Sequence, residues 1–207
     1  MDTGTPAEGR FNRRGLLCAL GARVAAPLLS GCAAGASYEK LPSPMRTGSR
    51  LDGLISRVDS YLDITNAHTG ERVALRFMED GQTSRRALRR LDWVFRDWRD
   101  GENPDMDPRI YWGLAALSST ARGQGHSGRI TLLSGFRTPQ TTRLLQSQSG
   151  GASSNSYHMK RRAADIRLEG VDMEQIAAMA EWLQVGGVGR YAGFTHIDSG
   201  PIRTWRG

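Results

Sequence analysis

SYHMKRRAADIRL, residues 156–168, ends in a short apolar strand and carries His158 and Asp165. GFTHIDSG, residues 193–200, places His196 on a later predicted strand. Two imidazole nitrogens and one carboxylate oxygen are the protein ligands of many catalytic zinc ions, which keep a fourth position open for water. A lone histidine is a weak signal, but one ligand in a loop and two on strands that can pair nearby predict a zinc site.

Short strands surround these two segments. RITLLSG (129–135), AADIRL (163–168), GGVGRY (186–191), GFTHID (193–198) and PIRTW (201–205) are predicted strands separated by glycines or by helical stretches. Further upstream, YLDITNA (61–67) and RVALRFM (72–78) each alternate apolar and polar residues on either side of the turn HTGE. This pattern predicts a hairpin with one buried face.

Four helices are predicted, each from a capping residue followed by apolar residues at helical spacing. They begin at Thr83 or Ser84 (with Leu88, Leu91, Phe95 and Trp98), at Asp107-Pro108 (with Ile110, Leu114 and Leu117), at Thr138-Pro139 (with Leu144 and Leu145) and at Asp172 (with Ile176, Ala180 and Leu183). Trp93, Trp98 and Trp112 are interpreted as core or rim packing rather than ligand platforms. The expected fold class is α+β: a small antiparallel sheet that carries the zinc site, flanked by helices, with an N-terminal β-hairpin.

The N-terminal residues are typical of an export signal. Arg13 and Arg14 precede an apolar run, 15–29, that is too short to span a bilayer, and the arginine pair suggests the twin-arginine route. The run ends in LSGC, residues 29–32, which resembles a lipobox and would make Cys32 a lipidated N-terminus; an ordinary cut between 33 and 37 is the alternative. We therefore expect an export signal at 1–31, a flexible tether at 32–50 and one domain at 51–207, in a periplasmic, membrane-anchored lipoprotein.

Cysteine usage and charge exclude some classes of protein. The two cysteines, Cys18 and Cys32, both lie in or beside the predicted signal, so we expect no disulfide in the folded domain. The net charge of +7 comes from arginines spread along the chain, without a basic run interleaved with aromatic residues, so we expect no nucleic-acid partner. An anionic cell-envelope surface fits this charge, and so does an ordinary solvated arginine-rich surface.

Several spaced motifs resemble a known family. SGFRTPQTTRLL (134–145), SYHMKRRAADIRL (156–168), GGVGRY (186–191) and FTHIDSGPIRTW (194–205) are similar, in this order, to the YcbK-like murein endopeptidases. These belong to the zinc D-Ala-D-Ala carboxypeptidase superfamily, which also includes the hedgehog signalling domain. The likeness runs from about Tyr61 to Trp205 and includes NAHTGERVAL (66–75) and RDWRDGE (96–102).

The resemblance implies roles for individual residues. His158, Asp165 and His196 match the three zinc ligands of the superfamily, and Arg137 matches the arginine that hydrogen-bonds the scissile carbonyl or its developing oxyanion. Ser156 and Tyr157, beside the first ligand, are candidates to orient it or to bind substrate. Tyr191 is a further substrate-binding candidate, with packing as the alternative. His68 and His126 lie in polar turns and receive no role.

The chain departs from its relatives at two points. Many relatives place an acid three residues before the last histidine, or a histidine two before it, to accept a proton from the attacking water; here these positions are Gly193 and Phe194. Asp198 lies on the same predicted strand face as His196 and is either the base or the group that holds a ligating histidine in one tautomer. Relatives also usually carry glycine where this chain has Arg161, which would cost about 1 kcal/mol if the position needs a positive φ.

Together these features predict a zinc-dependent peptidoglycan hydrolase, murein endopeptidase-like, that cleaves amide bonds in stem peptides or their cross-links. The alternatives are a D,D-carboxypeptidase, a non-catalytic zinc-stabilised module that binds cell-wall peptides or a protein, and a lipoprotein scaffold without metal. The missing upstream base motivates the binding module.

Overall fold

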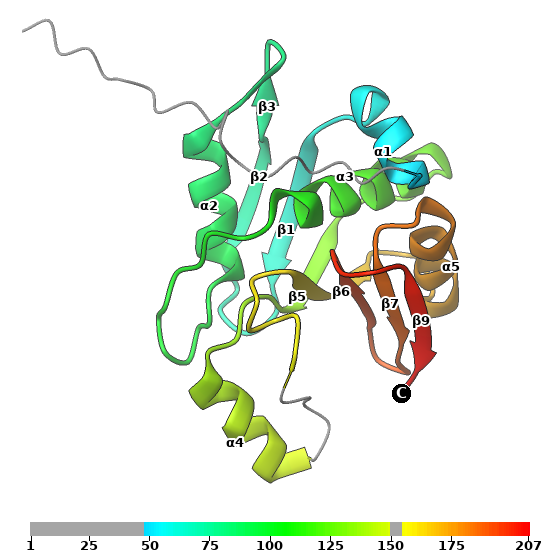
Figure 1. Ribbon diagram of the computed structural model, residues 1–207. Helices are drawn as coiled ribbons and strands as arrows, with labels where there is room; N and C mark the ends of the chain where they lie inside the picture. The colour runs from blue at the N-terminus through cyan, green and yellow to red at the C-terminus, as the bar shows by residue number, and fades with distance from the viewer. Residues whose placement is uncertain (1–47, 150–154) are drawn as a thin grey trace, which may run out of the picture. The chain divides into compact units, whose positions relative to one another are not determined.

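The computed structural model describes residues 48–149 and 155–207 (Figure 1). The predicted export signal, the Cys32 lipidation site and most of the predicted tether lie outside the described residues. Arg50, which the sequence placed in the tether, is the first residue of a short helix, α1 (Arg50–Leu54), and a 3-10 turn, η2 (Ile55–Arg57), follows it.

A seven-stranded sheet forms the centre of the described chain, with the order β2-β1-β5-β6-β8-β7-β9. Its strands are β1 (Tyr61–Asn66), β2 (Arg72–Arg76), β5 (Ile130–Ser134), β6 (Ala163–Leu168), β7 (Gly187–Arg190), β8 (Thr195–Asp198) and β9 (Arg203–Arg206). A separate two-stranded ribbon pairs β3 (Met78–Glu79) with β4 (Gln82–Thr83). The fold is mixed α+β, as expected.

The sheet corrects the sequence prediction in size and in strand direction. It is not small, and it is not wholly antiparallel, because β1 pairs parallel with β5 and β7 pairs parallel with β9. β1 and β2 are antiparallel neighbours, with Ile64 opposite Val73. Each parallel pair joins strands separated by other elements of the chain, and the apolar pattern of a single segment does not encode such a partner.

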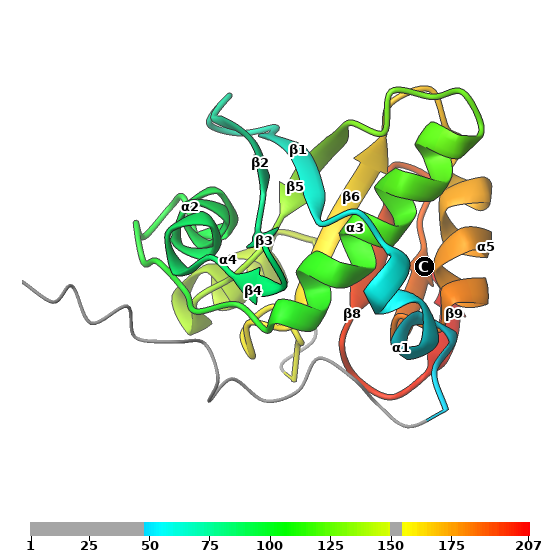
Figure 2. The same ribbon diagram turned by 90° about the horizontal axis from the view of Figure 1, so that it is seen from above.

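Four longer helices accompany the sheet: α2 (Arg85–Phe95), α3 (Pro108–Gly123), α4 (Pro139–Ser149) and α5 (Met173–Leu183). All four predicted caps accept a backbone N–H: Ser84 from Ala87, Asp107 from Arg109, Thr138 from Thr141 and Asp172 from Gln175. Helices α3 and α5 lie side by side against the sheet (Figure 2), while α2 packs on β1 and β2.

Helix α2 ends one turn earlier than its apolar stripe predicts, so Trp98 is not a helical residue. The helix ends before Arg96, which has an extended ψ of 158°. The next residue, Asp97, accepts the backbone N–H of Thr138 with its side-chain carboxylate. Trp98 is 40% exposed and stacks on His68, with ring centroids 5.1 Å apart. Trp112 is buried, whereas Trp93 is half exposed.

The alternation of side chains along the central strands gives the sheet one face that packs against the helices and a second face that points away from them. Ala164, Ile166 and Ile197 point into the main core with the helices. Residues at the intervening positions of β6 and β8 therefore point to the opposite face. These intervening residues include the predicted metal ligands.

Candidate metal centre

Strands β6 and β8 bring two of the three predicted ligands together. They pair antiparallel with Asp165 directly opposite His196, so both side chains leave the second face of the sheet side by side. Asp165 Oδ1 lies 2.8 Å from His196 Nδ1. The register of a single strand pair thus fixes this contact.

The third predicted ligand, His158, comes from the loop before β6. Its side chain is buried, and its Nδ1 lies 2.6 Å from the backbone oxygen of Gly135, just after β5. Gly135 itself packs so closely that an added Cβ would lie 2.5 Å from the backbone oxygen of Phe95. The end of β5 therefore holds the His158 ring against β6.

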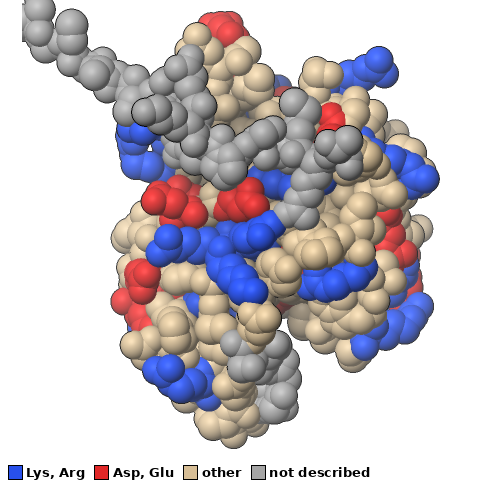
Figure 3. Space-filling model, viewed as in Figure 1, with Lys and Arg blue, Asp and Glu red and all other residues tan. Residues whose placement is uncertain are grey.

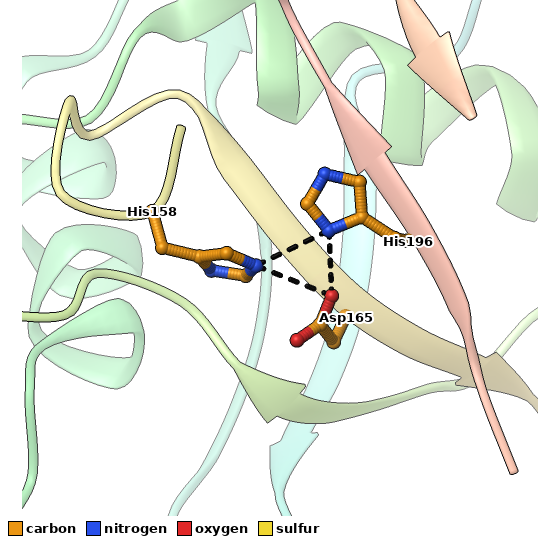
Figure 4. Close-up of side chains that lie close together, drawn as sticks. All are labelled: His158, Asp165 and His196. Atoms are coloured by element: carbon orange, nitrogen blue, oxygen red, sulfur yellow. Dashed lines mark hydrogen bonds and ion pairs between the residues drawn. The ribbon is translucent and has the colours of Figure 1, made fainter. Parts of the chain in front are cut away.

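Three candidate ligand atoms converge at one point (Figure 4). His158 Nε2 is 3.2 Å from Asp165 Oδ1 and 3.2 Å from His196 Nδ1. Donors of a tetrahedral zinc site, each about 2.0–2.1 Å from the ion, lie about 3.3 Å from one another. The observed spacing therefore fits a metal ion of this size, and no second such group occurs in the described ranges 48–149 and 155–207.

Hydrogen bonds on the far side of each ring set which nitrogen is free. A backbone carbonyl can only accept, so Nδ1 of His158 carries the proton and the neutral ring leaves its Nε2 lone pair facing the cluster. His196 Nε2 lies 3.3 Å from Asp198 Oδ2, which favours a proton there and a free lone pair on Nδ1. Two lone pairs and a carboxylate facing each other repel unless a cation or a proton lies between them.

The charge states of His158 and Asp165 match this arrangement, whereas His196, which lies between two carboxylates, favours a second proton that a bound cation would displace. Burial lowers the pKa of His158 below its ordinary value and outweighs the attraction of Asp165. Burial also opposes charge on His196, but its hydrogen bonds with Asp165 and Asp198 raise its pKa. Although burial disfavours its ionised form, the contacts of Asp165 with His158 and His196 hold its pKa well below the usual range. The cluster therefore keeps an ionised carboxylate and one neutral imidazole ready for a cation.

Asp198 lies behind His196 rather than in front of the cluster. Its side chain is fully buried, and it accepts hydrogen bonds from the backbone of Gly187 at 3.2 Å and of Gly200 at 2.7 Å. The Arg203 guanidinium binds both of its oxygens, at 3.1 and 2.7 Å. Asp198 thus shares a strand face with His196, as expected, and its contact with the outer nitrogen favours the orienting role over that of base.

Arg137 lies on the other side of the cluster, between β5 and α4. Its NH2 group is 3.6 Å from Asp165 Oδ2, and its buried Nε–H has no hydrogen-bond partner within residues 48–149 and 155–207. Burial lowers the pKa of Arg137, although the Asp165 charge opposes this, and a guanidinium remains charged at any ordinary pH. An unpaired buried N–H beside the cluster is a donor available to a ligand.

The cluster opens into a cavity of about 350 Å³. It is lined by Arg137, Asn155, Ser156, Tyr157, His158, Asp165, Tyr191, Phe194, His196, Arg203 and Trp205. All the predicted site residues of the folded domain are in this lining except Asp198. Figure 3 shows one side of the molecule hollowed between α4 and the β7–β9 edge, with Lys and Arg atoms gathered above the hollow.

The predicted substrate-binding residues make different contacts in this cavity. Ser156 Oγ accepts the backbone N–H of His158 at 3.3 Å, so it supports the His158 loop. The Arg203 guanidinium carbon lies over the Tyr157 ring, 4.9 Å from the ring centroid. The Tyr191 ring stacks on Phe194 and its hydroxyl accepts from Trp205 Nε1 at 3.0 Å. Ser156 therefore supports the loop that carries His158, while both tyrosines form part of the cavity wall.

Sequence reasoning assigned no role to Asn155, Phe194, Arg203 or Trp205, although they line the same cavity. Arg203 and Trp205 lie in the PIRTW strand, two residues apart and thus on one face. A buried carboxylate needs a charged or hydrogen-bonding partner. Arg203, five residues after Asp198, was the signal in the sequence that could have indicated this partner.

Arg161 has a φ of +62°, the left-handed conformation that the glycine of relatives would suit. The position therefore requires a positive φ, and this chain accepts the strain of a side chain there. The Arg161 backbone oxygen accepts the N–H of Asp107, which ties this turn to the start of α3. With this turn in place, the candidate ligand atoms of His158, Asp165 and His196 still lie together in one cluster.

The fold and the site define a class of protein: a mixed α+β domain with a two-histidine, one-carboxylate centre that faces an open cavity. Residues 56–205 match the family model described as peptidoglycan L,D-endopeptidase MepK. The chain belongs to this family, which is a family of metallopeptidases.

Two relatives illustrate the extent of the match. The chain is 34% identical over 148 residues to the probable peptidoglycan L,D-endopeptidase MepK of Haemophilus influenzae, covering 70% of this chain and 78% of that protein. It is 32% identical over 179 residues to the peptidoglycan L,D-endopeptidase MepK of Escherichia coli strain K12, covering 86% and 93%. No solved structure matched the chain. Among the described residues, no helix combines the length and apolar character needed to cross a membrane.

Proposed function

We propose that this chain is a zinc-dependent peptidoglycan hydrolase that cleaves an L,D amide bond within stem peptides or their cross-links. One observation carries the proposal: His158 Nε2, Asp165 Oδ1 and His196 Nδ1 face one another within 3.2 Å, at the base of an open cavity. The family match supports peptidoglycan as substrate and a metallopeptidase as the class of enzyme. The relatives' names support the endopeptidase over the carboxypeptidase alternative.

Zinc suits the donor set better than the hard cations do. Imidazole nitrogens favour zinc and other transition metals, whereas Mg²⁺ and Ca²⁺ prefer oxygen ligands alone. A divalent zinc ion in such a site acts as a Lewis acid on a carbonyl and makes water acidic enough to be a nucleophile near neutral pH. His158, Asp165 and His196 would hold it.

Arg137 would stabilise the negative charge that develops on the scissile carbonyl oxygen. Its Nε–H is buried, lacks a partner in the part of the chain that the structure describes, and belongs to a group that lines the cavity. A fixed cationic donor of this kind lowers the barrier by about 3 kcal/mol when it meets charge that grows in the transition state. The ion pair with Asp165 keeps the guanidinium in place before substrate arrives.

Asp198 would act by holding the proton on His196 Nε2, so that Nδ1 stays free for the ion. Its carboxylate is fully buried, is absent from the cavity lining and meets only the outer nitrogen of the ring. The proposed substrate side of the site is therefore Arg137 with the walls formed by Tyr157 and Tyr191.

The charge of the cavity fits a stem-peptide substrate. Peptidoglycan stem peptides carry free carboxylates, and Arg137 and Arg203 are both in the lining. Opposite charges across a binding site favour the correct partner and speed its association. The aromatic wall of Tyr191, Phe194 and Trp205 adds an apolar surface for the peptide's aliphatic parts.

For localisation, we propose export to the periplasm and lipidation of Cys32. The support is the arginine pair, the short apolar run and LSGC at residues 29–32. Metabolic labelling with a fatty-acid analogue tests this: wild-type protein takes up the label and a Cys32→Ser variant does not. Labelled Cys32→Ser, or unlabelled wild-type protein, contradicts it.

Mass spectrometry of muropeptide digests tests the activity. Purified full-length protein, supplied with zinc, is incubated with defined cross-linked muropeptides whose amide bonds differ in the chirality of the two residues joined. We expect products from L,D bonds, none from D,D bonds, and none after chelation. Zinc-loaded protein that leaves every L,D bond intact, while a related enzyme cuts it in the same buffer, contradicts the proposal.

A further inference from the structure

Arg203 is the centre of a contact network behind the metal centre. Its guanidinium binds both oxygens of Asp198 side by side, the geometry in which an arginine fixes a carboxylate in orientation as well as in charge. Asp198 in turn meets His196 on the nitrogen that faces away from the cluster. Arg203, Asp198 and His196 thus form a continuous chain of contacts that leads to the candidate ligand atom Nδ1.

Two aromatic rings contact the Arg203 guanidinium. Its guanidinium carbon lies 4.9 Å from the ring centroid of Tyr157 and 4.9 Å from that of Trp205. Cation–π contacts of this kind stabilise a guanidinium where it is partly removed from water, and the Arg203 side chain is 38% exposed. The arginine is therefore fixed by Asp198 and by two walls of the cavity.

The backbone around Asp198 is built to let Arg203 approach. An added Cβ at Gly187 would lie 2.5 Å from Asp198 Oδ2 and still closer to the Arg203 guanidinium. At Gly200 it would lie 2.6 Å from Asp198 Oδ1 and 2.6 Å from the Tyr157 ring. Real Cβ atoms do not come so close, so glycine at both positions is what allows the pair to form.

We propose that Arg203 is a positioning residue for the metal centre: it fixes the Asp198 carboxylate, which fixes the tautomer and ring orientation of His196. Without Arg203, Asp198 would keep its two backbone donors but could rotate away from His196 Nε2. A carboxylate one step behind a ligating histidine, as Asp198 is, commonly changes metal affinity or activity by about 10- to 100-fold when it is removed, and Arg203 acts through that carboxylate, so we expect a loss at the lower end of this range. The inference rests on the metal site of the proposed function.

Zinc affinity of full-length variants tests this role, with Arg206 as the matched control. Arg206 lies on the same strand and also binds a carboxylate, that of Glu174, but its side chain is 73% exposed and is not in the cavity lining. Zinc dissociation constants are measured by competition with a chromophoric chelator for wild type, Arg203→Met, Arg203→Lys and Arg206→Met. The visible spectrum of the cobalt-substituted proteins and the unfolding temperature of the metal-free proteins are recorded in parallel.

We expect Arg203→Met to bind zinc about 10-fold or more weakly than wild type and to alter the cobalt spectrum. Arg203→Lys keeps the charge but not the two parallel hydrogen bonds, so we expect an intermediate loss. Arg206→Met should bind zinc as wild type does. If Arg203→Met does not fold, Arg203→Lys decides the question.

Other outcomes overturn the inference. Unchanged zinc affinity and cobalt spectrum in Arg203→Met, with only a lower unfolding temperature, would make Arg203 merely structural. If steady-state hydrolysis of a defined muropeptide gives a raised KM for Arg203→Met while its zinc affinity is unchanged, Arg203 is a substrate contact. Wild-type protein that binds no zinc would overturn both the inference and the proposed function, whereas zinc binding equal in wild type and the Arg203 variants would overturn the inference alone.

Discussion

Asp165 and His196 lie directly opposite each other on β6 and β8, with Asp165 Oδ1 2.8 Å from His196 Nδ1. Strand pairing fixes this contact, because a shift of one residue would turn either side chain to the core face. His158 completes the cluster from a loop held by Gly135. Two of the three candidate ligands therefore depend on the sheet and one on the loop that follows α4.

Asp165→Asn should remove zinc binding without unfolding the domain. The amide has nearly the same shape but lacks the charge that offsets a divalent cation, so we expect zinc affinity to fall by more than about 100-fold. Equilibrium competition with a chelator measures this. Asp63→Asn, at a buried carboxylate of the same sheet paired with Arg72, is the control and should keep wild-type zinc affinity. Asp165→Asn that binds zinc like wild type contradicts the site.

Arg137→Lys should lower kcat about 100-fold or more while one zinc ion per chain is retained. Lysine keeps a positive charge but cannot direct a fixed Nε–H toward the developing oxyanion. Steady-state hydrolysis of a defined muropeptide, with zinc content measured on the same samples, separates the two effects. Arg143→Lys, on the exposed side of α4, should leave both unchanged. A loss of zinc that parallels the loss of activity would instead make Arg137 a support for Asp165.

Local sequence patterns predicted much of the secondary structure. Ser84, Asp107, Thr138 and Asp172 all cap the helices that they were expected to begin, because a cap depends only on the next three residues. The segment AADIRL forms β6 with the predicted bounds. The predicted end of α2 was wrong, because Asp97 forms a hydrogen bond with Thr138, which is 41 residues away and leaves no local signal.

Contacts that are distant in the chain could not be predicted from one sequence. The parallel pairing of β1 with β5 and of β7 with β9 leaves no local pattern. The ligand preferences of zinc and the family motifs predicted His158, Asp165 and His196 as metal ligands, and the structure brings these three side chains together. The role of Asp198 depended on whether it faces the cavity or the back of His196, which spacing alone left open.

Arg161→Gly should stabilise the domain by up to about 1 kcal/mol, because glycine adopts the φ of +62° without the clash of a Cβ. The loss of the Arg161 contact with Phe136, at 5.6 Å, reduces this gain. Arg161→Val should destabilise it by more than about 1 kcal/mol, since a β-branched residue is least suited to this conformation. Urea unfolding of the metal-free proteins measures both. Equal stability of the two variants would mean that the turn relaxes to a negative φ.

Because Asp92 is buried, the free energy of unfolding of the domain should fall as pH rises from about 4 to about 6. Burial raises its pKa to about 6, although Tyr111 and the Met106 backbone N–H favour the charged form. In this window the folded protein holds a proton that the unfolded chain has released, so folding is favoured at the lower pH, by up to about 3 kcal/mol.

Asp92→Asn should remove most of this slope, because the amide oxygen still accepts from Tyr111 and never ionises. Urea unfolding at pH 4.5, 5.5 and 7 measures it, with Asp105→Asn, at an exposed neighbouring acid, as the control that keeps most of the slope. An unchanged slope in Asp92→Asn would assign the pH dependence to other groups.

Titration of zinc into metal-free protein tests the central claim most directly. Release of new amine groups from a muropeptide with an L,D bond is followed as zinc is added to full-length wild type and to His196→Ala. The account predicts that wild-type activity rises in proportion to zinc, stops rising at one equivalent and stays near zero in His196→Ala. Full activity before zinc is added, or equal activity in His196→Ala, would contradict it.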